Sequence, residues 1–339
     1  MVEILGSNGK PIILNEREKM VALHNQRQVN ALGYDIDITT LTSIIKKVTE
    51  QKFFQIAPAD YLPVRVGEGA WSSSLLTYRS FDLAADFAEG VLNTGANSAR
   101  LAVADAGIDA VPIKVNNWAK EIGWTLMDLA QAAKSGNWDL VTEKEKSRKK
   151  NWDLGIQKVA FLGLEGNSDV LGLYTQSGIE TNTTLITSAI SSQVGTPANI
   201  SAIVRGLLQA YRANCARTSM PSVFVMPEDD YLGMATPSSP SFPIKSLLEL
   251  FLETFKVMTG NPNFKILPCA YGDASNNSLG VTRYVLHNYD DASIRMDIPV
   301  DYTNTLANSV NNFSFQNVGY GQFTGVLAYR PKEMIYFQY

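Results

Sequence analysis

The residues best suited to chemistry are few and scattered along the 339-residue chain. The two histidines, His24 and His287, lie far apart in sequence, and neither lies in a motif typical of a Ser-His-Asp or Cys-His enzyme. The two cysteines, Cys215 and Cys269, are too few for a disulfide framework or a four-cysteine metal site. No phosphate-binding loop and no dinucleotide-binding glycine motif occurs. We therefore expect no catalytic residue, no cofactor and no metal site.

The strongest catalytic candidate is the acidic run Glu228, Asp229 and Asp230, which follows the strand-like stretch SVFVM. Enzymes with α/β folds often place catalytic groups at such a point. A simpler interpretation is a helix start, because Pro227 suits the first helical position and acidic side chains are favoured in the first turn by the helix dipole. A cytosolic α/β enzyme that uses this cluster is therefore the alternative from a different functional class.

The composition predicts a large folded protein, because 45% of the residues are hydrophobic and only 18% are charged. No apolar run approaches the roughly 18 residues of a membrane span, and the first residues do not read as a secretion signal. We expect a protein made in a cytosol and without a membrane partner. The formal net charge of -4 argues against a generally basic nucleic-acid binder.

The segment 139–163 predicts one long helix, because it lacks proline and is rich in Glu, Lys and Leu. Residues 142–151 contain no apolar side chain, so the helix would contact the core at its two ends and be bare in its centre. The apolar stripe at the ends consists of Trp138, Val141, Trp152, Ile156 and Val159. Residues 143–150 hold five basic and two acidic residues, which is either an ordinary solvated helix face or a functional basic surface.

Three other regions have readable patterns. Residues 15–33 predict a helix with a weak apolar stripe, which is more typical of an arm than of a core element. The strand-like stretches TYRSFDL and AVPIKV flank a glycine- and asparagine-rich centre, which predicts a two-stranded hairpin with its tip near residues 93–100. Such a hairpin is marginal in isolation and needs a partner. From residue 185 onward, helical and strand patterns alternate as in a compact mixed α/β domain.

The order of these elements resembles that of the major capsid proteins of tailed bacteriophages, whose Hong Kong ninety-seven type of fold is shared with encapsulin shells. The stretch WTLMDLAQAAKSGNWDLVTEKEKSRKKNWDLGIQKVAFLG is similar to the family's short helix, break and spine helix. DVLGLYTQSGIETNTT, with Gly172 and Leu173, resembles the passage from the spine helix to the axial domain. SVFVMPEDDYLGMAT and TGVLAYRPKEMIYF, with Arg330 and Pro331, resemble axial strands. The resemblance covers about residue 53 to the C-terminus.

The resemblance implies an α+β capsid fold in four parts. The N-terminal arm would be 1–52, and the peripheral domain with its spine helix would be 53–71 and 119–184. An extended β-hairpin loop would be 72–118, and an axial mixed α/β domain would be 185–339, with part of 285–315 returning to the peripheral domain.

The resemblance also implies a function. The protein would self-assemble through hexamers and pentamers into an icosahedral virion shell around double-stranded DNA, and assembly would take place in the host cytoplasm. Scaffolding, portal and decoration proteins are candidate partners. The loop tip would contact neighbouring subunits through Asn93, Thr94, Gly95, Asn97 and Arg100. The spine helix would face the lumen and touch packaged DNA weakly and without sequence preference through Lys144, Lys146, Arg148, Lys149 and Lys150.

Two points qualify the resemblance. Some family members cross-link neighbours covalently through a loop lysine, but the expected tip VLNTGANSAR has no lysine, and Lys114 and Lys120 lie toward its base. We therefore expect no such cross-link. The nearest alternative is an encapsulin-like compartment, which has the same fold but encloses a cargo enzyme instead of DNA.

Overall fold

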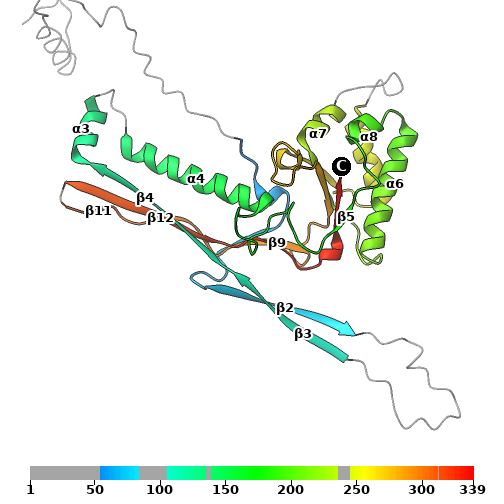
Figure 1. Ribbon diagram of the computed structural model, residues 1–339, viewed down its shortest axis with the longest axis horizontal. Helices are drawn as coiled ribbons and strands as arrows, with labels where there is room; N and C mark the ends of the chain where they lie inside the picture. The colour runs from blue at the N-terminus through cyan, green and yellow to red at the C-terminus, as the bar shows by residue number, and fades with distance from the viewer. Residues whose placement is uncertain (1–53, 84–104, 135–138, 236–244, 312) are drawn as a thin grey trace, which may run out of the picture. The chain divides into compact units, whose positions relative to one another are not determined.

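The computed structural model describes residues 54–83, 105–134, 139–235, 245–311 and 313–339 (Figure 1). The expected arm and the expected loop tip lie outside these ranges. Within them, the strands form four sheets of two to five strands.

The largest sheet has the strand order β5-β14-β8-β6-β7 and mixes parallel and antiparallel pairs. Its central strands are buried on both faces, and alternate side chains enter two different apolar cores. The first core includes Trp152 and Phe161, and the second includes Phe251 and Phe255. In β6, for example, Val223 and Val225 belong to one core, whereas Phe224 and Met226 belong to the other. The strands are β5 (Glu180–Asn182), β6 (Val223–Pro227), β7 (Lys265–Cys269), β8 (Arg283–His287) and β14 (Met334–Gln338).

Helices supply the rest of the second core. They are α5 (Ile190–Gln193), α6 (Pro197–Asn214), α7 (Glu228–Ala235) and α8 (Leu247–Thr259). Thr196 caps α6, and Ser246 and Glu249 form a capping box at the start of α8. A short 3-10 turn, η3 (Ala270–Gly272), follows β7, and another, η4 (Pro331–Glu333), precedes β14. The helical and strand patterns expected after residue 185 are present here as a sheet packed against helices. The sheet also includes residues 180–182, and the strands within residues 294–328 pair in other sheets.

A second sheet contains two long antiparallel strands that are far apart in sequence. Strand β4 (Asn116–Thr125) pairs along its whole length with β12 (Ser314–Phe323), and the short β10 (Val300–Asn304) and β11 (Asn308–Ser309) pair with β12 from its other side. Part of residues 285–315 was expected to return to the region around β4, and the segment that pairs with β4 is residues 314–323. Helix α3 (Leu126–Lys134) follows β4 directly.

The long predicted helix is α4 (Leu140–Leu162), which lies against β4 and β12 in its first half and in the first apolar core in its second half (Figure 1). Asp139 caps its start by accepting a hydrogen bond from the Thr142 N–H at 3.1 Å. At its end, the chain turns back so that the N–H groups of Leu173 and Tyr174 donate to the carbonyls of Ala160 and Phe161. These bonds satisfy carbonyls that a helix end leaves without partners.

Gly172 is required at this turn because of close backbone contact. A Cβ atom there would lie 2.4 Å from the carbonyl carbon of Phe161 and 2.5 Å from the nitrogens of Leu162 and Gly163. The Gly-Leu pair that carried the family resemblance is therefore the point at which the chain packs onto the end of α4.

The predicted hairpin is present as β2 (Ser74–Leu83) and β3 (Asp105–Lys114), which pair antiparallel from Ser74–Lys114 to Leu83–Asp105. At its base lies a small sheet of β1 (Val64–Val66), β9 (Ile294–Ile298) and β13 (Val326–Ala328), with the 3-10 turn η1 (Pro58–Asp60) just before it. No helix in the described part of the chain is long and apolar enough to cross a membrane.

His287 makes the stability of the fold depend on pH. The imidazole is fully buried in β8, and burial lowers its pKa from the ordinary 6.5 to about 4, an effect that the Asn288 backbone only partly offsets. Between these two values the unfolded chain binds the proton and the folded chain does not. The contribution is therefore fully present above pH 6.5 and is lost as pH falls toward 4.

We expect the free energy of unfolding of wild type, relative to His287→Leu, to fall by about 2 kcal/mol between pH 7 and pH 5. The difference between the two proteins is the quantity to measure, by urea titration with circular dichroism. It cancels the opposite contribution of Asp273, whose pKa is raised to about 6 mainly by burial. Parallel pH profiles for the two proteins would contradict this role of His287.

Candidate functional site

The centre of α4 is held by a single buried arginine. Arg148 is 2% exposed, and its guanidinium points from the helix into the sheet of β4, β10 and β12. One terminal nitrogen donates to the carbonyl oxygen and to Oδ1 of Asn317, at 2.9 and 2.8 Å. The other donates to Asn304 Oδ1 at 3.1 Å, and Nε donates to the Tyr302 hydroxyl at 2.8 Å. Asn317 in turn donates to Glu145 on α4 at 2.8 Å.

Two glycines on β12 make room for this contact. A Cβ atom at Gly319 would lie 2.6 Å from Nε of Arg148, and one at Gly321 would lie 2.5 Å from the Trp152 ring. Neither glycine has a positive φ, so close approach of α4 explains them. The pattern Gly-x-Gly in β12 therefore lets the helix lie directly on the sheet.

Arg148 corrects the prediction that five basic residues of this helix face the lumen. The prediction is wrong for Arg148, because its donors are used by acceptors inside the protein and its side chain has no accessible surface to offer. The helix is also not bare in its centre, since a polar contact takes the place of the missing apolar stripe.

The four lysines of this segment lie at the surface or half-buried. Lys144 donates to the Gly123 carbonyl at 2.7 Å, Lys146 pairs with Glu143 at 2.9 Å, and Lys150 donates to Gln55 at 2.9 Å. Lys149 is exposed. With Arg148 buried, the surface charges on this part of the helix are those of four lysines, partly offset by Glu143 and Glu145. The basic surface is thus weaker than the sequence suggested.

Asp230, the most buried residue of the acidic run 228–230, has a structural role. Asp230 is 4% exposed and accepts hydrogen bonds from the N–H groups of Ile190 and Ser191, at 3.0 and 2.7 Å, and from the Tyr284 hydroxyl at 2.8 Å. It therefore fixes the start of α5 to α7 and β8. Asp229 and Asp230 line a hollow of about 320 Å³ together with Asp273. Within the described residues, no group of three or more His, Cys, Asp or Glu side chains is arranged to hold a metal ion.

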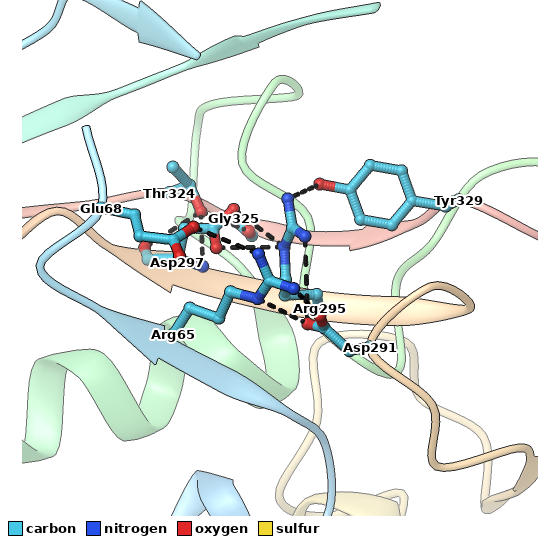
Figure 2. Close-up of polar contacts among 8 residues, drawn as sticks. All are labelled: Arg65, Glu68, Asp291, Arg295, Asp297, Thr324, Gly325 and Tyr329. Carbon is cyan, nitrogen blue, oxygen red and sulfur yellow. Dashed lines mark hydrogen bonds and ion pairs between the residues drawn. The ribbon is translucent and has the colours of Figure 1, made fainter. Parts of the chain in front are cut away.

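A polar network joins β1 and β9 to residues that flank β13, among them Thr324 and Tyr329 (Figure 2). Arg65 on β1 makes two hydrogen bonds to the Asp291 carboxylate and a third to Glu68 at 3.1 Å. Arg295 on β9 contacts Asp297 at 3.1 Å and donates to the Tyr329 hydroxyl at 2.7 Å. Burial raises the pKa of Asp297, and Arg295 partly opposes that shift. The network fixes the strand that leads into the hairpin.

An apolar groove of about 510 Å³ opens beside the second half of α4. Gly155 is among its lining residues, and a Cβ atom there would have no neighbouring side chain within 4 Å. Its lining includes Trp118, Trp152, Leu154, Ile156, Leu164 and Phe323.

The family model described as "Major capsid protein" matches residues 90–339, which is most of the chain. The chain belongs to the major capsid protein family. No curated protein matches it in sequence. This membership, together with the fold, implies a structural rather than an enzymatic role for the capsid protein.

Solved structures of phage capsids share the fold at low sequence identity. The capsid of Myoviridae phage XM1 matches with a TM-score of 0.68 and 14% identity, covering 88% of this chain and 97% of that one. A protein of Mycobacterium phage Ogopogo matches with a TM-score of 0.52 and 10% identity, covering 86% and 94%. The mature capsid of bacteriophage PhiM1 matches with a TM-score of 0.53 and 10% identity, covering 86% and 89%. The predicted capsid fold is confirmed.

The sequence contained a signal for Arg148 that charge alone concealed. Arg148 lies four residues before Trp152 and seven after Val141, so it is in phase with the apolar stripe of the helix. An arginine in phase with a buried stripe, opposite a Gly-x-Gly strand, is a candidate for a buried contact. No comparable signal marked the hairpin base, where the charged network joins residues from distant segments.

We expect Arg148→Met to lower the free energy of unfolding by about 2 to 4 kcal/mol, because it leaves several buried acceptors without donors. Arg148→Lys should recover only part of this loss, since an ammonium lacks the planar fork. The matched control is Lys149→Met on the exposed neighbour, which should change stability by less than about 0.5 kcal/mol. Urea titration of the capsid protein measures all three. Equal effects of Arg148→Met and Lys149→Met would show that the buried contact contributes little.

Proposed function

We propose that this capsid protein assembles through hexamers and pentamers into an icosahedral shell that encloses double-stranded DNA, and that assembly takes place in the host cytoplasm. The observation that supports this most directly is the family match over residues 90–339, on a chain whose fold follows that of phage capsids nearly end to end. Portal, scaffolding and decoration proteins are the further partners in this proposal.

The division into parts is also a proposal. We assign α4 as the spine helix of a peripheral domain, with the β4–β12 sheet beside it, and the five-stranded sheet with its helices as the axial domain. The β2–β3 hairpin is the extended loop, and its tip at residues 93–100 is assigned to contacts with neighbouring subunits.

The test is light scattering on a sizing column, with negative-stain images of the leading peak, for the protein expressed alone and together with its candidate scaffolding protein. Pentamers, hexamers or closed shells are expected. Nucleic acid inside shells from infected cells supports a virion, whereas shells that contain only protein cargo support the encapsulin-like alternative. A monomer under every condition would contradict the proposal.

The surface of α4 supports a weak role in DNA contact. Lys146, Lys149 and Lys150 lie away from the side of the helix that Arg148 fixes to the sheet, whereas Lys144 lies on the same side as Arg148 and donates to the Gly123 carbonyl. A contact made by a few lysines would be independent of sequence and would weaken with salt, because binding releases counterions from the phosphates. Such contacts suit a container that must hold any part of a genome.

We expect replacement of Lys144, Lys146, Lys149 and Lys150 by Gln to weaken binding of unassembled subunits to random DNA and to flatten its salt dependence. Each phosphate contact contributes a slope of about 0.9 in log affinity against log salt. The matched control carries the same charge change in the axial half, at Lys245, Lys256, Lys265 and Lys332. Fluorescence anisotropy measures both. If the two variants lose the same affinity, net charge and not this helix determines binding.

A further inference from the structure

Trp71 has an unusual combination of backbone and side chain. Its φ is +66°, in the left-handed region that disfavours residues other than glycine, and its indole is 71% exposed. Two residues shortly before it, Gly67 and Gly69, have positive φ and are glycines, as expected. The chain therefore places a tryptophan at a position that glycine would fit better, and the described part of the subunit does not bury it.

The backbone around Trp71 is held in place although the side chain is not covered. The Trp71 N–H donates to Oε1 of Gln322 at 2.8 Å, and Gln322 is itself buried and donates to Asn117 at 2.7 Å. Its ring meets Tyr320 at one side, with 5.6 Å between the ring centres. The segment begins at Arg65, which the network of Figure 2 fixes to Asp291. The indole is thus presented outward from a fixed base, which lowers the entropy lost when it binds.

The apolar groove beside α4 is the complementary feature. Its volume of about 510 Å³ exceeds the roughly 150 Å³ that holds a benzene ring in a protein cavity. Aromatic side chains of Trp118, Trp152 and Phe323 line it, and Asn151 and Glu165 at its edge offer oxygens that an indole N–H needs as acceptors. Gly155 is one of the lining residues, and a Cβ atom there would stand in open space.

Trp71 cannot reach the groove of its own subunit. Along β12, the odd-numbered residues Gly319, Gly321 and Phe323 face α4 and the groove. The even-numbered residues Tyr320 and Gln322 contact Trp71, so Trp71 lies on the opposite face of the sheet. A second copy of the chain must supply the groove for each indole.

We propose that Trp71 of one subunit inserts into the α4 groove of the next subunit and is an anchor residue of shell assembly. The inference rests on the proposed function. Tryptophan is enriched among residues that dominate binding energy. Val66 and Leu76, five residues before and after Trp71 in sequence, are also exposed. The Trp71 side chain, here called the knob, and the groove are different patches of one molecule, so the contact is heterologous. Repeated around a closed rotation, such a contact forms a ring such as a pentamer or hexamer.

Two pairs of variants test the knob and the groove. Trp71→Gly relieves the backbone strain while removing the indole, and Gly155→Leu fills the groove from an open helix position. Both should fold at least as stably as wild type, yet each should raise the concentration needed for assembly by about tenfold or more. Trp71→Phe and Gly155→Ala should assemble nearly as wild type does.

Arg217→Gly is the control for strain relief, because Arg217 is exposed and also has a φ of +66°. It should fold well and leave assembly unchanged. Normal assembly of both Trp71→Gly and Gly155→Leu would overturn the inference. Weaker assembly of Arg217→Gly to the same extent would also overturn it, because backbone relief alone would then explain the effect.

Cross-linking identifies the contact directly. Because Trp71→Cys also removes the indole, shells that carry both Trp71→Cys and Gly155→Cys are assembled at a subunit concentration above the raised threshold. Treated with a short bismaleimide, they should give a ladder of linked subunits on a denaturing gel, and either single variant should not. The native Cys215 and Cys269 are buried and should not react. Intact shells of the double variant without a ladder would overturn the inference and leave the proposed function standing. Absence of wild-type assemblies under every condition would overturn both.

Discussion

The position of α4 depends on the buried guanidinium of Arg148. Burial of a charge is costly unless every donor finds an acceptor. Here the acceptors come from Asn317, Asn304 and Tyr302 on β12 and β10, and from the Lys120 carbonyl on β4. Among the described contacts no carboxylate pairs with Arg148 directly, and Glu145 acts through Asn317. A planar fork of donors meets these oxygens in one register only. The contact therefore specifies where the helix lies on the sheet, which an apolar stripe would do less strictly.

This constraint explains several features that seem unrelated in sequence. Gly319 and Gly321 are needed because α4 approaches the strand too closely for side chains. Gly172 is needed at the other end, where the chain packs against the last turn of the helix. Between these points the second half of α4 lies in the apolar core that also covers one face of the five-stranded sheet. One helix thus joins the β4–β12 sheet to the five-stranded sheet.

The sequence predicted those elements whose partners are local or whose pattern is strongly periodic. The strand at 223–227 and the long α4 follow from an apolar run and from composition, and the β2–β3 hairpin follows from strands that flank a glycine-rich centre. Strand β4 was not predicted. Its partner, β12, lies about two hundred residues away, so no turn in the local sequence indicates the pairing. Arg148 was placed on the surface because charge was given more weight than its phase with Trp152. The burial of a charged residue depends on tertiary acceptors that sequence spacing does not show.

Burial of Arg148 weakens the positive surface that the proposed DNA contact of α4 depends on. Four lysines opposed by Glu143 and Glu145 give a weak field, screened within about 10 Å at ordinary salt. In the proposed DNA-filled shell, such contacts would add up over many copies, while each one would stay labile enough for DNA to move during filling. Contacts between subunits must instead be strong and specific in position. A fixed, strained and exposed tryptophan meets that need better than a field of mobile charges.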